Sequence, residues 1–244
     1  MSIWEYILLF SSVLIGGAAI YVFQMNSGKR LKLVLSFSGA YILGITILHL
    51  MPGVFSSDFH HLEYFVLLGF IIQLMVDQLS QGVEHGHVHA HQESKWTLAI
   101  QVMLGLCLHA FLEGLPLAEY ESFHASHHAD EHNHNHLFWG IILHKVPAAF
   151  ALSLLLREAG FEVKRIFGFL IIFAAMSPLG AFTTTLFGQN LELLSQMVAV
   201  VVGSFLHIAT TIIFEADENK QHRISWPKIG AIALGLGISM LTTH

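Results

Sequence analysis

Long apolar stretches separated by short polar segments run along all 244 residues of the chain. Each stretch has or approaches the roughly 20 residues that an α-helix needs to cross about 30 Å of hydrocarbon. The pattern predicts an all-α polytopic membrane protein with eight transmembrane helices. The predicted spans are 3–24, 33–55, 62–79, 96–118, 137–156, 166–187, 193–214 and 226–241.

Composition supports the same class, because 54% of the residues are hydrophobic and only 11% are charged, against about 25% charged residues in soluble domains. The polar segments between the spans are too short to fold around a core of their own. Residues 1–244 are therefore predicted to form a single transmembrane domain. The first span follows no basic segment and precedes no small-residue cleavage site, so we expect a retained helix rather than a signal peptide.

The basic residues predict the orientation of the spans. With eight spans, ten of the eleven Lys and Arg residues fall on one side of the membrane, and the loops 56–61, 119–136 and 188–192 on the other side contain none. By the positive-inside rule the basic side is cytoplasmic, so both termini are expected outside the cytoplasm. We therefore expect a multi-pass protein of the plasma membrane or cell inner membrane. The ten residues are Lys29, Arg30, Lys32, Lys95, Arg157, Lys164, Arg165, Lys220, Arg223 and Lys228.

Histidine is unusually frequent, with 18 residues in the chain, and it is concentrated in two polar tracts. Such tracts lack the apolar residues needed to fold alone and are typical of flexible metal-binding segments. We expect them to capture metal ions at the two mouths of a path. The alternatives are a solvated loop that happens to be rich in histidine, and adventitious metal binding without a physiological role. The cytoplasmic loop 81–95 contains His85, His87, His89 and His91, and the outer loop 119–136 contains His124, His127, His128, His132, His134 and His136.

Ionisable side chains at membrane depth are the candidates for chemistry. His109 and Glu113 are four residues apart in the fourth span, so a helix places them on one face about a turn apart. His144 lies in the fifth span, directly before Lys145. A bilayer accepts such groups only when they pair with each other, with water or with an ion. Two imidazoles and a carboxylate predict a divalent metal site, with zinc as the first choice, and the single cysteine, Cys107, excludes a Cys-based zinc site.

Three further polar residues in the spans each allow two interpretations. His49 is either a ligand near the outer mouth of the path or a hydrogen-bonded histidine at the membrane interface. Asp77 is either an acid on the cytoplasmic side of the path or a partner of Lys95 or of a loop base. His207 is either a path residue or a packed and hydrogen-bonded side chain.

The chain resembles the ZIP transporters of zinc and iron over nearly its whole length. The resemblance rests on the eight spans, the outward termini, the His-rich loop after the third span and a set of motifs. These motifs are His109-Ala-Phe-Leu-Glu113-Gly114-Leu115, His144-Lys145-Val-Pro147, Ser177-Pro178-Leu179-Gly180, Gly203-Ser204-Phe205-Leu206-His207 and His49-Leu50-Met51-Pro52.

The resemblance implies a fold and a way of working. The bundle would contain inverted repeats in a 3+2+3 arrangement, with spans one to three related to spans six to eight, and with spans four and five carrying the site. Spans one, four, five and six would move as a unit against spans two, three, seven and eight, commonly in a homodimer.

The motifs depart from those of family members that hold two metals side by side. Ala110 and Lys145 follow the two histidines, Ala148 replaces a glutamate of span five, and Ser177 stands where span six often has a carboxylate. Resemblance to the branch with His-Lys in span five implies a single metal, with the Lys145 ammonium at the position of the second cation, where it helps to balance Glu113. Snorkelling of Lys145 to the membrane interface is the alternative.

These observations lead to one functional hypothesis and its rivals. The chain would transport a divalent metal, zinc first, with Fe²⁺, Cd²⁺ and Mn²⁺ as alternatives, into the cytoplasm through the buried site of His109, Glu113 and His144, with Ser177 as a further path residue. The rivals are an intramembrane zinc-dependent hydrolase, a cation exporter and a metal sensor. The expected partners are the lipid bilayer, the transported metal and a second copy of the chain; no enzyme activity, organic cofactor or nucleic acid is expected.

Overall fold

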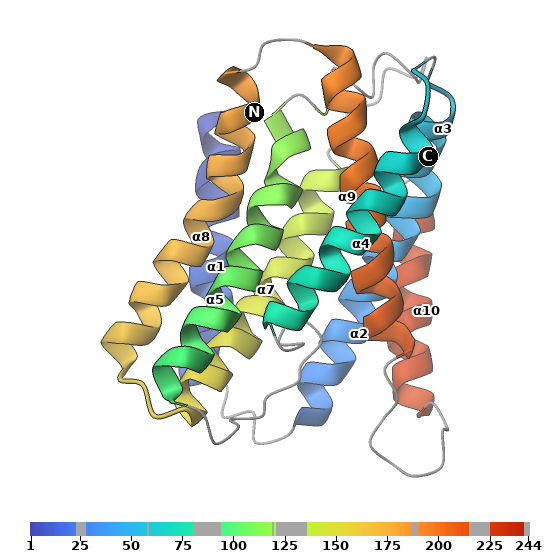
Figure 1. The fold of residues 1–244 in the computed structure, drawn as a ribbon. Helices are drawn as coiled ribbons and strands as arrows, with labels where there is room; N and C mark the ends of the chain where they lie inside the picture. The colour runs from blue at the N-terminus through green and yellow to red at the C-terminus, as the bar shows by residue number, and fades with distance from the viewer. Residues whose placement is uncertain are drawn as a thin grey trace.

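The computed structural model consists of helices throughout the residues that it describes (Figure 1). These are residues 1–22, 28–57, 59–80, 94–118, 120, 136–186, 190–214 and 225–241. The elements are α1 (Ile3–Val22), α2 (Gly28–Ile45), the π-helix η1 (Thr46–Leu50), α3 (Met51–Phe55), α4 (Leu62–Ser80), α5 (Lys95–Gly114), the 3-10 helix η3 (Leu115–Ala118), α7 (His136–Glu158), α8 (Val163–Leu186), α9 (Leu191–Phe214) and α10 (Trp226–Leu241).

The helices confirm the predicted all-α polytopic class and match the eight predicted spans one for one. Seven of the described spans are long and apolar enough to cross a membrane. The eighth, α10, has 16 residues, which is about 24 Å of helix. Large apolar side chains such as Leu67 on α4 and Ile100 on α5 are exposed on the outside of the bundle, as expected for a protein whose surroundings are lipid.

Two spans are built from more than one kind of helix, and in each a proline lies close to one of the changes. The second span passes from α2 through η1 into α3, and Pro52 occupies the first turn of α3. Proline has no N–H to donate, so the regular hydrogen-bond ladder cannot continue through it. The fourth span changes at Gly114 from α5 to η3, which contains Pro116. The helices α7 and α8 continue through Pro147 and Pro178.

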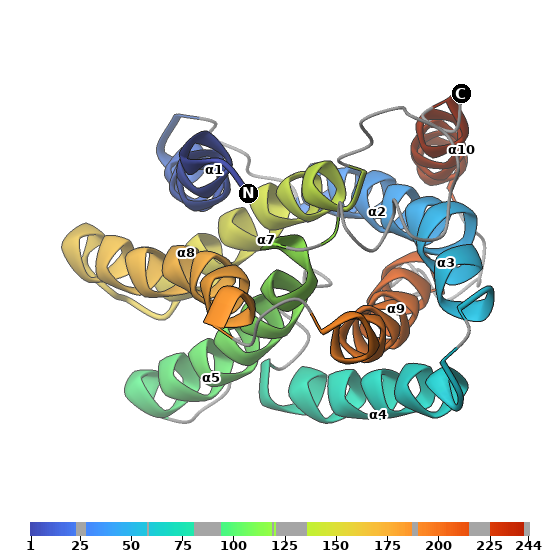
Figure 2. The ribbon, with the colours of Figure 1, turned by 90° about the horizontal axis from the view of Figure 1, so that it is seen from above.

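The eight spans divide into two sub-bundles, which Figure 2 shows side by side. The first sub-bundle contains α1, α5, α7 and α8, and the second contains α2 with η1 and α3, α4, α9 and α10. Most close packing lies inside the sub-bundles, between α4 and α9, α2 and α10, α1 and α7, and α5 and α8. The main packing between them is at two seams, the α2–α7 seam and the α4–α5 seam.

The packing inside the sub-bundles has the symmetry that an inverted repeat would produce. Exchanging α1 with α8, α2 with α9, α4 with α10 and α5 with α7 turns the α4–α9 pair into α10–α2 and the α1–α7 pair into α8–α5. In each case the exchanged spans run in opposite directions, because their positions in the order of spans differ by an odd number, five or one. The two seams do not follow this exchange, since their counterparts, α9–α5 and α10–α7, pack far less among the described residues.

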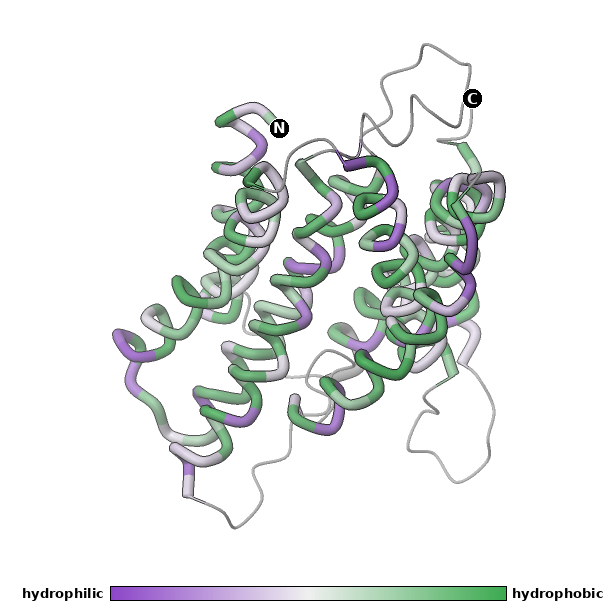
Figure 3. Tube along the Cα trace, turned by 45° about the horizontal axis from the view of Figure 1, so that its top comes forward, coloured by the Kyte–Doolittle hydropathy of each residue, from purple (hydrophilic) through white to green (hydrophobic). Residues whose placement is uncertain are grey.

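Two apolar cores fill the bundle, one towards each membrane face, and buried polar residues lie between them. On α7, Ile141 belongs to one core and Ala149 to the other, with His144 and Lys145 between them. Figure 3 shows hydrophilic positions interrupting the hydrophobic helices at this depth. We call this set the polar layer; it consists of Ser38, Gln73, His109, Glu113, His144, Lys145, Ser177 and Ser204, all buried.

Candidate metal site

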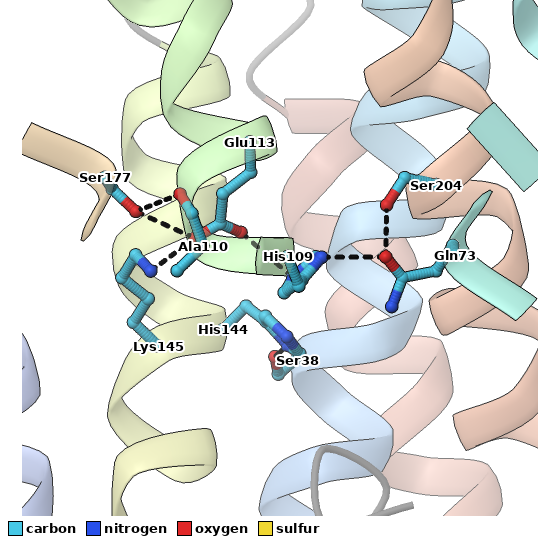
Figure 4. Close-up of polar contacts among 9 residues, drawn as sticks. All are labelled: Ser38, Gln73, His109, Ala110, Glu113, His144, Lys145, Ser177 and Ser204. Atoms are coloured by element: carbon cyan, nitrogen blue, oxygen red, sulfur yellow. Dashed lines mark hydrogen bonds and ion pairs between the residues drawn. The ribbon is translucent and has the colours of Figure 1, made fainter. Parts of the chain in front are cut away.

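The four ionisable residues predicted at membrane depth meet in the polar layer (Figure 4). His109, Glu113, His144 and Lys145 are each at most 2% exposed. His109 and Glu113 lie on one face of α5, with 3.2 Å between His109 Nε2 and Glu113 Oε2. The His144 ring approaches from α7, with its centroid 5.9 Å from that of His109 and the two rings nearly perpendicular.

The carboxylate of Glu113 is held by groups from α7 and α8. The Lys145 ammonium forms an ion pair with Glu113 Oε1 and lies 4.9 Å from the centroid of the Phe173 ring. Ser177 Oγ lies 3.2 Å from the same carboxylate oxygen and donates a hydrogen bond to the Ala110 carbonyl at 2.6 Å. Lys145 therefore does not snorkel to the interface; its charge is used inside the bundle.

Close approach of α5 and α8 puts Ser177 within reach of Glu113. A Cβ atom at Gly114 would collide with the backbone of Ser177, and one at Gly180 would collide with the Phe111 carbonyl. The two helices can touch only because both positions are glycine, a common device for tight packing of membrane helices. The glycine in the fourth-span motif thus has a packing role that brings a hydroxyl to the carboxylate.

The imidazole of His109 is held by groups from α4 and α9. Its Nδ1 lies 3.0 Å from Gln73 Oε1, and Ser204 Oγ donates to the same oxygen at 2.9 Å. An amide oxygen can only accept a hydrogen bond, so Nδ1 of His109 carries the proton and Nε2 carries the lone pair. On the other histidine, His144 Nδ1 lies 3.5 Å from Ser38 Oγ on α2.

The spacing of His109 and Glu113 suits two ligands of one zinc ion. With bonds of about 2.0 Å, neighbouring ligand atoms of a tetrahedral zinc are roughly 3.3 Å apart, and the Nε2–Oε2 distance is 3.2 Å. Among the described residues, no three His, Cys, Asp or Glu side chains have the spacing of a closed metal site. The structure thus brings two predicted ligands to ligand spacing and places the ring of the third, His144, beside them.

The remaining predicted path residues lie outside this group. His49 is buried in the π-helix η1, and His207 Nε2 lies 3.6 Å from Asp77 Oδ2. Lys95 Nζ donates to the Gly160 carbonyl at the turn between α7 and α8, so this contact gives no support to the suggested pairing of Asp77 with Lys95, and the alternative pairing with a loop base stays a prediction. Asp77 faces α9.

Of the neutral members of the polar layer, the sequence analysis proposed only Ser177 as a path residue and named Ser204 only within a motif. Gln73, Ser38 and Ser204 each contact a predicted ligand or the residue that holds it. An amide in the middle of an apolar span is the signal that could have pointed to Gln73, because a buried amide needs a hydrogen-bond partner.

The two histidine tracts lie outside the described residues, apart from the start of α7 at His136, whose side chain is not described. Their predicted capture of metal is therefore untested. The tract residues concerned are His85, His87, His89, His91, His124, His127, His128, His132 and His134.

Comparison with known proteins places the chain in a family. The sequence model described as ZIP Zinc transporter matches residues 81–243. Zinc transporter ZIP9 of Xenopus tropicalis is 31% identical over 178 residues, covering 68% of this chain and 55% of the relative. Zinc transporter ZIP9 of Micropogonias undulatus is 35% identical over 155 residues, covering 59% of this chain and 48% of the relative. The chain thus spans about half the length of the relatives that it matches.

Proposed function

The chain belongs to the ZIP zinc transporter family, and from this premise we propose that it carries Zn²⁺ across a membrane through the site of His109, Glu113 and His144. The observation that carries the proposal is the buried His109–Glu113 pair at 3.2 Å with the His144 ring beside it. Membership of a transporter family removes the intramembrane hydrolase from consideration.

The ion pair between Lys145 and Glu113 supports a site for one metal. A second divalent ion beside the first would have to share Glu113 with the buried ammonium of Lys145. Two cations that contact the same carboxylate repel each other strongly in a low dielectric. Lys145 therefore stands in for a second cation, and Glu113 keeps Oε2 towards His109. Two zinc ions per chain at the centre of the wild-type protein would contradict this reading.

Zinc enters the cytoplasm in this proposal, driven by its own gradient or by a coupled ion, since the sequence contains no P-loop for ATP. The basic loops and the loop 81–95 face the cytoplasm, and the loop 119–136 and both termini face outwards. A metal bound by imidazole requires the neutral ring, so uptake of protons by the histidines favours release.

Fe²⁺, Cd²⁺ and Mn²⁺ are further substrates to test. In this proposal the chain works as a homodimer.

Zinc flux into proteoliposomes that contain a zinc-sensitive dye tests the proposal. Alanine at His109 or His144 is expected to abolish most flux while the protein stays folded in the membrane, because each change removes a ligand. Glu113 is tested in the double variant Glu113→Gln/Lys145→Met, which removes the carboxylate without leaving the buried Lys145 ammonium unpaired, and flux should be lost there too. His61, which is exposed outside the spans, provides the matched control His61→Ala, which should keep wild-type flux. Wild-type flux in His109→Ala would refute the site.

The two tracts are expected to raise the local concentration of zinc without forming the transport site. In a tract-substituted protein, in which the ten tract histidines are replaced by serine, the apparent affinity should change while flux persists. Labelling of His87→Cys and His127→Cys, each with Cys107→Ser, should proceed from opposite faces of the membrane. Labelling of both positions from one face would break the eight-span orientation.

A further inference from the structure

We infer that Gln73 is a positioning residue for His109, and that it makes the zinc affinity of the site depend on the packing of the α4–α5 seam. The inference rests on the proposed function. Gln73 contacts the imidazole of His109, and we infer that it acts on zinc through that ring.

The contacts of Gln73 select one tautomer of His109. Gln73 Oε1 accepts from His109 Nδ1 at 3.0 Å and from Ser204 Oγ at 2.9 Å, and it is completely buried. With the proton held on Nδ1, the lone pair of Nε2 is directed at the space next to Glu113 Oε2, 3.2 Å away. Such an acceptor behind a ligating imidazole also raises its basicity, and loss of the acceptor commonly weakens metal binding about 10- to 100-fold.

The groups that hold Glu113 and the groups that hold His109 come from different sub-bundles. Glu113 is held by Lys145 and Ser177, which belong to the first sub-bundle, as Glu113 itself does. Gln73 and Ser204 belong to α4 and α9 of the second sub-bundle. The support of the carboxylate is therefore internal to one sub-bundle, whereas the support of His109 crosses the seam.

Close packing at the seam keeps Gln73 in reach of His109. A Cβ atom at Gly105 on α5 would collide with Ser80 at the end of α4, so the two helices are nearly in backbone contact one turn from His109. If the sub-bundles separate here, His109 loses its acceptor, whereas the charge of Glu113 stays balanced by Lys145. The closed seam is then the high-affinity arrangement and the open seam the low-affinity one.

Calorimetric titration of the full-length tract-substituted protein with Zn²⁺ tests the positioning role. Gln73→Met keeps the approximate volume and removes the acceptor, so the Kd should rise about 10- to 100-fold. Gln73→Glu keeps an oxygen acceptor and should restore the Kd to within a few-fold of the parent. Gln78→Met, the same change at an exposed position of the same helix, should leave the Kd unchanged.

The outcomes separate the positioning role from the proposed function. An unchanged Kd in Gln73→Met, or a Kd in Gln73→Glu as weak as in Gln73→Met, would overturn the role of Gln73 while His109→Ala still lost central binding. Parental binding and flux in His109→Ala would instead overturn the proposed function. Should Gln73→Met fail to fold, Ser204→Ala keeps the amide and removes its second donor; a few-fold weaker Kd is expected, and an unchanged one would count against the inference.

Coupling to the seam is tested by alkylation of a buried cysteine. If zinc binds more tightly when the seam is closed, zinc must in turn favour the closed seam. Ser80 is fully buried at the seam, so zinc should slow the alkylation of Ser80→Cys in a Cys107→Ser background. Addition of Gln73→Met should remove most of this effect of zinc. A labelling rate that zinc does not change in the parent would refute the coupling.

Discussion

The two halves of the site differ in where their support comes from. The carboxylate half, Glu113 with Lys145 and Ser177, is complete within the first sub-bundle. The histidine half takes Gln73 and Ser38 from the second sub-bundle. A buried charge must stay compensated at every moment, whereas a metal ligand has to bind and then let go. The charge of Glu113 is therefore compensated within one sub-bundle, whereas the contacts that adjust the zinc affinity of the two histidines cross the seams.

The largest expected effect comes from breaking the carboxylate half. Lys145→Met leaves Glu113 as a buried charge without its ammonium, which costs about 3–5 kcal/mol of stability, and the thermal midpoint of the detergent-solubilised protein should fall with loss of transport. Lys164→Met, at an exposed position of α8, is the matched control. The double variant Glu113→Gln/Lys145→Met should regain much of the stability but no transport. A single variant with the parental midpoint would show that the ion pair is not needed for the fold.

The contrast between the halves also separates what the sequence predicted from what it did not. Charged groups in an apolar helix are so costly that His109, Glu113, His144 and Lys145 could be identified from the sequence alone. The spans followed from length and hydropathy for the same reason, since the bilayer restricts backbone to helices.

The neutral partners of the two histidines were harder to predict. Gln73 and Ser204 are 131 residues apart, and their meeting depends on how α4 and α9 are rotated and packed, which hydropathy does not encode. Serine in a membrane helix can also satisfy itself on its own backbone, as Ser36 does on the Lys32 carbonyl, so its presence predicts no partner. The neutral partners of the two histidines were therefore visible only in three dimensions.

Acidification is expected to act on the histidine half alone. Zinc needs neutral imidazole, and free histidine has a pKa of about 6.5. Protons therefore compete with zinc increasingly as the pH falls, and the zinc affinity of the tract-substituted protein should drop by at least about 10-fold between pH 7 and pH 5. Calorimetry across this interval measures the change, with the thermal midpoint recorded at each pH to exclude unfolding. A flat affinity would mean that His109 and His144 are not the ligands that matter.

The α2–α7 seam is expected to affect zinc binding less than the α4–α5 seam. Ser38 Oγ lies 3.5 Å from His144 Nδ1, at the limit of a hydrogen bond, whereas the Gln73–His109 contact is 3.0 Å. Ser38→Ala should therefore raise the zinc Kd of the tract-substituted protein no more than a few-fold, which corresponds to less than about 1 kcal/mol. Ser36→Ala, two residues away on α2 and bonded within its own helix, is the control.

The change in the zinc Kd of Ser38→Ala shows how much each seam contributes to the zinc affinity. A few-fold change beside a 10- to 100-fold change in Gln73→Met would place most of the adjustable affinity at the α4–α5 seam. His144 is then the ligand that is least tied to the second sub-bundle, in keeping with the 3.5 Å between its Nδ1 and Ser38 Oγ. An effect of Ser38→Ala as large as that of Gln73→Met would instead mean that groups of the second sub-bundle position both histidines. Separation of the sub-bundles would then weaken zinc binding by His109 and His144 together.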